Sequence, residues 1–257
     1  MRAVSKTPAT PRPEAADLLL IRGLRFAWPG LAADVLRLAE LRLQAGRSYF
    51  LHGPSGSGKS TLLGLMAGVL LPREGCVELQ GQDWAALPGG RRDRRRAERV
   101  GVIFQQFNLL PYLSCLDNVL LPCHLSRARA TRCAGSPRQE AQRLLERMEL
   151  PVSLWDRRAG ALSIGQQQRV AAARALVGRP PLVIADEPTS ALDDPLREAF
   201  MDLLMGECRA GGSTLVFVSH DERLAHHFDE RISLLELQAV VDRPGSPAPT
   251  AHEVVSP

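Results

Sequence analysis

A nine-residue segment, Gly53–Thr61, limits the possible folds of this chain more than any other feature. It matches the pattern G-x-x-x-x-G-K-[ST] without a mismatch, and such glycines let backbone N–H groups curl around phosphates. An apolar run at 48–52 predicts a strand before the segment, and residues 60–67 predict a helix after it, whose N-terminus attracts anions. The segment therefore predicts a nucleoside triphosphate site that contains Gly53, Pro54, Ser55, Gly56, Ser57, Gly58, Lys59, Ser60 and Thr61.

The loop holds Lys59, one of two lysines in a chain with 30 arginines. A compact ammonium group suits the β- and γ-phosphates, which it neutralises, whereas arginine presents a planar fork. The hydroxyl of Ser60 is predicted to bind Mg²⁺. A small GTPase is excluded, because its guanine-reading motif needs a second lysine and the other one here is Lys6.

The length of 257 residues suits one large α/β domain, or a domain with a smaller insert. Five scattered cysteines without a C-x-x-C pair argue against a disulfide framework or a zinc site, and for a reducing compartment. No stretch reaches 18 apolar residues, and the N-terminus lacks the pattern of a signal peptide. We therefore expect a cytoplasmic protein that would need a different chain to span a membrane.

Short apolar runs alternate with helical patterns, which predicts an α/β domain with a mainly parallel sheet. Strands are expected at 18–26, 47–52, 76–80, 100–104, 182–186, 214–218 and 231–236. Helices are expected at 59–69, 115–127, 138–149, 165–178, 195–210 and 221–227. The domain would span 17–238, with an inserted helical subdomain at about 112–160, a disordered leader at 1–16 and a disordered, proline-rich tail at 239–257.

The densest run of charge, Arg91–Arg96 followed by Arg99, leaves two interpretations open. Charge blocks usually form the solvated face of a helix or loop. The run could instead contact lipid headgroups or a partner protein. Nucleic acid is not an expected partner, because no aromatic residues are interleaved with the arginines and no nucleic-acid-binding motif accompanies them.

A second set of motifs follows the phosphate loop. Residues 182–189 form an apolar strand that ends in Asp186 and Glu187, where one carboxylate can hold the Mg²⁺ shell and the other can polarise water. About twenty residues earlier, Leu162–Arg169 leads into a helix, and a later strand ends in Ser219 and His220.

This combination resembles the ATP-binding-cassette (ABC) ATPases over roughly residues 18–236, with the family's motifs in the family's order. The resemblance implies a P-loop NTPase core with a mainly parallel sheet, an antiparallel β N-terminal part and a helical subdomain that continues into the signature helix. It also implies ATP hydrolysis coupled to transport, with ATP and Mg²⁺ as cofactors.

The resemblance implies roles for residues outside the phosphate loop. Gln105 is similar to the glutamine-loop residue that senses Mg²⁺ and couples to the transport partner, with Gln106 as the less favoured alternative. Glu187 is similar to the general base, and His220 to the switch histidine that contacts the γ-phosphate. The implied catalytic residues are Glu187, His220 and Lys59, and the implied metal ligands are Ser60, Gln105 and Asp186.

Ser163, Gly165 and Gln166 resemble the signature that caps the γ-phosphate on a second subunit, and Ser163 also suits a helix N-cap. Ile164 departs from the family's leucine-serine-glycine-glycine-glutamine, since it replaces the first glycine. If this position needs a positive φ, the substitution would cost about 1–3 kcal/mol. If it is an ordinary residue of the first helical turn, the side chain is tolerated, and we favour a working ATPase.

The resemblance also implies roles for two further positions. Asp193, in Ser190–Asp193, resembles the aspartate loop that crosses the dimer interface. Trp28 stands where the family stacks an aromatic ring on adenine. Phe26 is the alternative, and a role in the core remains open for either ring.

Residues 104–111 and 116–122 resemble the lipoprotein-releasing and macrolide-exporter ATPases. The resemblance implies a head-to-tail dimer, most simply a homodimer, held at the inner face of the cell membrane by an integral-membrane permease. Export or lipoprotein release is the expected function. The alternatives are a mechanotransmitting or signalling ATPase that moves no substrate, an amino-acid-type importer ATPase, and, because of Ile164, a weakly hydrolytic regulator.

Overall fold

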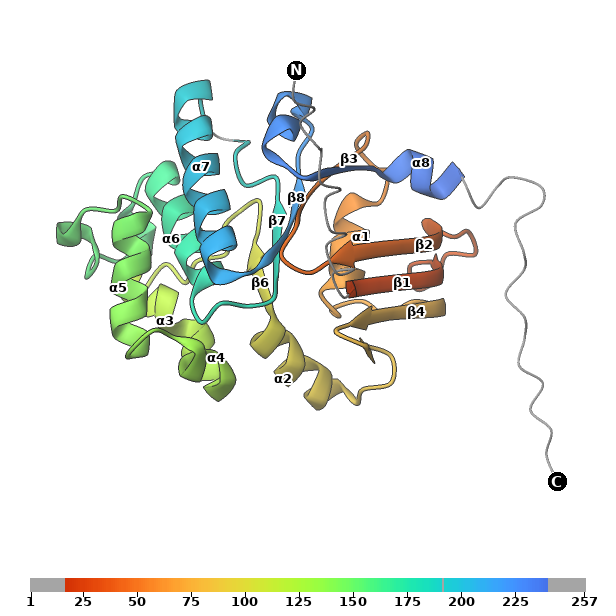
Figure 1. Cartoon of the computed structure of the whole chain (residues 1–257), viewed down its shortest axis with the longest axis horizontal. Helices are drawn as coiled ribbons and strands as arrows, with labels where there is room; N and C mark the ends of the chain where they lie inside the picture. Colours follow the sequence, from red (N-terminus) through yellow and green to blue (C-terminus); the bar gives the residue numbers. More distant parts are fainter. Residues whose placement is uncertain (1–16, 191, 240–257) are drawn as a thin grey trace, which may run out of the picture.

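The structure, a computed structural model, describes residues 17–190 and 192–239. Its larger sheet is parallel, with strand order β6-β7-β8-β3-β9. These strands are β3 (Ser48–His52), β6 (Val100–Ile103), β7 (Leu182–Asp186), β8 (Thr214–Val218) and β9 (Glu230–Ser233). The predicted fold class is confirmed, and only β8 separates the strand before the phosphate loop from the strand with the acidic pair (Figure 1).

A second, antiparallel sheet lies at the opposite end of the molecule from the helices α3–α5 (Figure 1). It contains β1 (Asp17–Phe26), β2 (Leu36–Gln44), β4 (Glu74–Leu79) and β5 (Gln82–Asp83) in the order β2-β1-β4-β5. The strand β2 is not among the strands that the sequence pattern predicts. Its buried leucines stand at positions 36, 38, 41 and 43, so the two-residue period is broken in the middle of the strand.

The helices match most of the predicted ranges, and two assignments need correction. The run at 231–236 is not one strand, because β9 ends at Ser233, where its partner β3 also ends and the ladder stops. The segment at 222–227 is a 3-10 helix. The helices are α1 (Lys59–Met66), α2 (Gly89–Arg99), α3 (Cys115–Leu125), α4 (Arg127–Arg132), α5 (Pro137–Arg147), η1 (Val152–Leu154), η2 (Ala159–Ala161), α6 (Ile164–Leu176), α7 (Asp194–Gly211), η3 (Glu222–His227) and α8 (Leu234–Ala239).

Two apolar cores lie on the two faces of the parallel sheet. Alternate residues of β3 divide between them: Phe50 belongs to the core with the helices, whereas Tyr49 and Leu51 belong to the core shared with the antiparallel sheet. Phe217 and Val218 of β8 divide in the same way. Each fully buried side chain of this kind contributes about 1.5–3 kcal/mol, so the sheet that carries the motifs is held from both sides.

Arg129 of α4 fastens the helical region to the sheet. Its buried guanidinium donates to the carbonyl oxygens of Val177 (2.8 Å), Ala175 (2.7 Å) and Val100 (3.2 Å). Burial lowers the pKa of Arg129 to about 10, which leaves it charged at neutral pH. Residues 112–160 contain α3, α4 and α5, and the boundary of a helical subdomain at 112–160 stays a prediction.

The arginine run lies in α2, a helix without a buried residue. Arg95 donates to the carbonyl oxygen of Leu79 (2.7 Å) and Arg96 to that of Gly68 (3.3 Å). Of the two interpretations of the arginine run, these contacts favour a solvated helix face over contact with lipid headgroups or a partner protein. Within the part of the chain that the structure describes, no helix has both the length and the apolar character needed to cross a membrane. The predicted leader at 1–16 and the predicted tail beyond Ala239 lie outside the described residues.

Candidate functional site

The phosphate loop has the local geometry that its glycines predict. Gly56 (φ 77°) and Gly58 (φ 98°) are both left-handed. A Cβ on Gly58 would also come within 2.7 Å of Leu36 Cδ2, so this position needs glycine for two reasons. The Lys59 ammonium folds back onto the loop and donates to the carbonyl oxygens of Gly53 (2.8 Å) and Pro54 (2.9 Å).

The tertiary fold joins the phosphate loop to the acidic strand at Ser60 and Asp186. The Ser60 hydroxyl donates to Asp186 Oδ2 over 3.2 Å, although the two residues are far apart in sequence. Burial raises the pKa of Asp186 above its usual value, with a smaller contribution from the Glu187 charge, and the Ser60 hydrogen bond and the Lys59 charge oppose this. A second positive charge beside these oxygens would therefore be stabilised.

Glu187 and His220 come together at the ends of β7 and β8. His220 Nδ1 lies 3.6 Å from Glu187 Oε2, and the histidine side chain is exposed. Glu187 is left-handed (φ 45°), and its N–H donates to the Val218 carbonyl oxygen over 3.0 Å. The sequence alone places these residues in one motif set, and the structure brings them to one edge of the sheet.

The signature residues begin α6. Ser163 is the N-cap and forms a capping box with Gln166, in which each side chain contacts the other's backbone N–H over 3.0–3.4 Å. Ile164 is the first residue of the helix, is 58% exposed and has no positive φ. The strain considered for this position is therefore absent. Gly165 lies next to Leu192, with 3.8 Å between its ideal Cβ position and Cδ2.

Asp193 caps the next helix. Its side chain accepts from the Leu196 N–H at the start of α7 (3.1 Å), and the helix is tied to the histidine segment by the Arg197–Asp221 ion pair (2.7 Å). Ala191, within the predicted aspartate loop, lies outside the described residues. In this single chain the signature and Asp193 each form a local cap, whereas the Ser60–Asp186 and Glu187–His220 pairs join distant segments.

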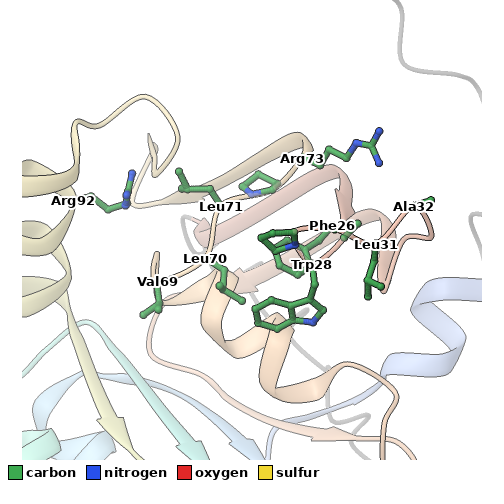
Figure 2. A pocket seen from close by; sticks show the side chains of 13 residues that line it. Phe26, Trp28, Leu31, Ala32, Val69, Leu70, Leu71, Arg73 and Arg92 are labelled. Atoms are coloured by element: carbon green, nitrogen blue, oxygen red, sulfur yellow. The ribbon is translucent and has the colours of Figure 1, made fainter.

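Gln105 and Trp28 are both accessible. Gln105 lies two residues after the end of β6 and is exposed, as is its neighbour Gln106. Trp28 is 42% exposed and meets the buried Phe26 edge to face, with ring centroids 5.2 Å apart. Figure 2 shows Trp28 beside Leu70 at an open groove of about 690 Å³, and no residue of the phosphate loop lines this groove. Exposure favours Trp28 over Phe26 as the ring free to stack on a base.

One contact at the phosphate loop has no signal in the sequence. The Gln238 side-chain amide donates to the Ser57 carbonyl oxygen over 3.2 Å, so α8 supports the phosphate loop. A single glutamine in a short helix carries no motif that could reveal this.

The arrangement suits a magnesium–nucleotide complex. Ser57 Oγ is buried and, within the described residues, has no hydrogen-bond partner, so a phosphate oxygen would supply one. Ser60 and Asp186 offer the hard oxygen ligands that Mg²⁺ takes.

Comparison with known proteins agrees with this geometry. The family described as "ABC transporter" matches residues 36–190. The chain is 39% identical over 234 residues to the "Lipoprotein-releasing system ATP-binding protein LolD" of Anaeromyxobacter dehalogenans, covering 90% of this chain and 96% of the relative. It is 42% identical over 205 residues to the "Uncharacterized ABC transporter ATP-binding protein YbbA" of Escherichia coli, covering 80% and 88%.

A solved structure has a similar fold. It is described as the "Dimeric structure of a post-hydrolysis state of the ATP-binding cassette MJ0796 bound to ADP and Pi". The TM-score is 0.74 at 34% identity, over 84% of this chain and 93% of that one.

Proposed function

The chain belongs to the ABC transporter family as an ATP-hydrolysing subunit, and from this premise we propose how its residues bind ATP, pair with a second subunit and drive a permease. The observation that carries the proposal is the meeting of three motifs at one sheet edge. Ser60 contacts Asp186, and Glu187 faces His220 beside the same loop.

ATP binding uses the backbone of Gly53–Thr61 and the Lys59 ammonium. Lys59 would exchange the carbonyl oxygens of its own loop for β- and γ-phosphate oxygens, which carry more negative charge. Ser60 and Asp186, with Gln105, would hold Mg²⁺, and the ion would neutralise phosphate charge. Trp28 would stack on the adenine base.

Hydrolysis needs a base next to the γ-phosphate. Glu187 would accept a proton from the attacking water as the new bond to phosphorus forms and the bond to the ADP oxygen breaks. His220, 3.6 Å from the Glu187 carboxylate, would contact the γ-phosphate and keep the base oriented. The His220 side chain is exposed, so it can reach a phosphate without a change of fold.

The site is completed by a second copy of the chain. Ser163, Gly165 and Gln166 would cap the γ-phosphate bound on the partner, and Asp193 would cross the interface. Support comes from the solved relative, which is a dimer in a post-hydrolysis state. The N–H groups of the first turn of α6 would face such a phosphate, and Ile164 is exposed in an ordinary helical conformation that leaves room for it.

An integral-membrane permease is the proposed partner, and it would hold the subunit at the inner face of the cell membrane. Large apolar side chains are exposed around the glutamine motif and the α3–α5 helices, where a cytoplasmic segment of the permease could bury them: Phe104, Tyr112, Leu125 and Val152. Lipoprotein release or a related export is the proposed process, since several relatives are lipoprotein-releasing ATP-binding proteins.

A pull-down from native membranes tests this proposal. Tagged Glu187→Gln protein would be incubated with ATP and detergent-solubilised membranes, and the captured proteins identified by mass spectrometry. We expect a permease with a large extracytoplasmic domain, captured with ATP but not with ADP. Capture of an importer permease with a solute-binding protein would show that the subunit drives import and not lipoprotein release. Capture of soluble proteins alone would overturn the permease assignment.

A further inference from the structure

Three potential metal ligands gather away from the phosphate loop. Glu198 on α7 and the consecutive His226 and His227 on η3 each offer a ligand atom, and these atoms all lie within 4.8 Å of one another. The two imidazole centroids are 4.0 Å apart. None of the three has a role in the proposed ATPase reaction.

We propose that Glu198, His226 and His227 bind one divalent transition-metal cation of the Zn²⁺ class. Two imidazoles and one carboxylate form a donor set that Zn²⁺ uses, and water would fill the fourth position. In a tetrahedral site the ligand atoms stand roughly 3.4 Å apart. His227 Nε2 and Glu198 Oε2, now 2.8 Å apart, would separate slightly to admit the ion, and the exposed Glu198 side chain can turn to allow this.

The hydrogen bond of His226 supports a ligand role. Its Nδ1 lies 2.6 Å from the Arg223 carbonyl oxygen. A carbonyl only accepts, so Nδ1 carries the proton and Nε2 keeps its lone pair. Metal-ligating histidines commonly have this arrangement, in which a backbone carbonyl fixes the tautomer and the ring orientation.

His227 and Glu198 already form a pair across the two elements. His227 Nε2 lies 2.8 Å from Glu198 Oε2, and the histidine side chain is only 14% exposed. A cation bound between these two atoms would replace their hydrogen bond, and His227 would then carry its ring proton on Nδ1. The nearby Arg223 guanidinium is engaged by Asp194 (3.1 Å) and Asp221 (2.8 Å), so its charge is compensated.

The site would join two segments that flank the ATPase motifs. α7 follows Asp193, and η3 follows His220. A bound cation would therefore fasten the helix of the aspartate loop to the helix of the histidine switch.

Titration of the nucleotide-free, full-length protein with ZnCl₂ tests the proposal by calorimetry and, with Co²⁺ as a probe, by visible absorption. We expect one ion per chain and a Tm rise of roughly 5–10 °C at 100 times the Kd. Because loss of even an outer-shell partner costs roughly 10–100-fold in affinity, His226→Ala should weaken binding by at least that much.

His124→Ala is the matched control, since His124 is an exposed histidine of α3 outside the trio. It should bind as tightly as the wild type. Glu198→Gln, which keeps the shape of the side chain, should weaken binding as His226→Ala does, with the metal-free Tm unchanged. Absence of saturable binding, or equal affinity in His226→Ala and His124→Ala, would overturn the site. Neither result depends on ATP hydrolysis.

Discussion

Glu187 illustrates how much of the site depends on the backbone of single residues. A non-glycine residue with φ 45° costs of order 1–2 kcal/mol relative to the usual right-handed conformation. The hydrogen bond from its N–H to Val218 holds this conformation and turns the carboxylate toward His220. Ile164 is the opposite case, because an unusual residue type occupies an ordinary helical conformation.

Asp186 gives a prediction for stability at this scale. Its raised pKa means that the folded state holds the proton to higher pH than the unfolded state, whose pKa is about 3.9. Stability from this group is thus lost as pH rises from the unfolded pKa through the folded one. Asp186→Asn should therefore raise the Tm of the nucleotide-free protein at neutral pH, and the gain should shrink toward pH values of about 4.

Asp193→Asn serves as its control, since asparagine caps a helix as well as aspartate and the residue is exposed. Its Tm should match that of the wild type. A lower Tm for Asp186→Asn at neutral pH would contradict the burial argument.

Two helices, α5 and α6, begin with the same capping box, and only one of them carries the signature. Ser136 pairs with Gln139 on α5 as Ser163 pairs with Gln166 on α6. Because the two capping boxes are alike, the same substitution in each can separate an effect on stability from an effect on ATP turnover.

Ser163→Ala and Ser136→Ala should each lower the free energy of unfolding by about 1 kcal/mol in urea titrations. Only Ser163→Ala should also reduce ATP turnover, by roughly tenfold or more, because a hydrogen bond to a charged phosphate is worth about 1.5–3 kcal/mol. Equal turnover in the two variants would remove Ser163 from the nucleotide site.

Arg129 sets the attachment of α4 to the sheet. Arg129→Met keeps much of the volume but leaves the carbonyl oxygens of Val177, Ala175 and Val100 without this donor. We expect a loss of roughly 2–4 kcal/mol in the free energy of unfolding, measured by urea titration. Arg127 is an exposed residue of the same helix, so Arg127→Met is the control. It should change the free energy of unfolding by less than about 0.5 kcal/mol.

The whole molecule places half of each proposed ATP site at the sheet edge and the other half at the start of α6. A single chain thus presents complementary halves, and a head-to-tail pair would complete two sites. The ATP-bound assembly should persist when hydrolysis is blocked.

Glu187→Gln should slow ATP turnover by about 10²–10⁴-fold and elute as a dimer with ATP in size-exclusion chromatography. With ADP it should elute as a monomer. The double variant Glu187→Gln/Ser163→Ala should stay monomeric with ATP, and turnover near the wild-type rate in Glu187→Gln would remove this residue from the base role.

The phosphate loop, the acidic strand end and the fold class follow from residue types and spacing alone. Those signals are local, because a loop that wraps phosphates needs particular residue types at fixed spacing. The Ser163 cap is equally local and was predicted from the residue type. The sequence does not predict β2, since its leucine spacing hides the two-residue period. The strand forms because it pairs with β1 along its length.

Which distant residues meet depends on the three-dimensional packing of the elements. Gln238 reaches the Ser57 carbonyl oxygen because α8 packs beside β2 and β9, and no spacing in the sequence encodes that contact. Glu198 approaches His226 and His227 because ion pairs join α7 to η3, among them Arg223–Asp194. Contacts of this kind depend on how whole elements bury their apolar faces, which is set by the complete core and not by any one segment.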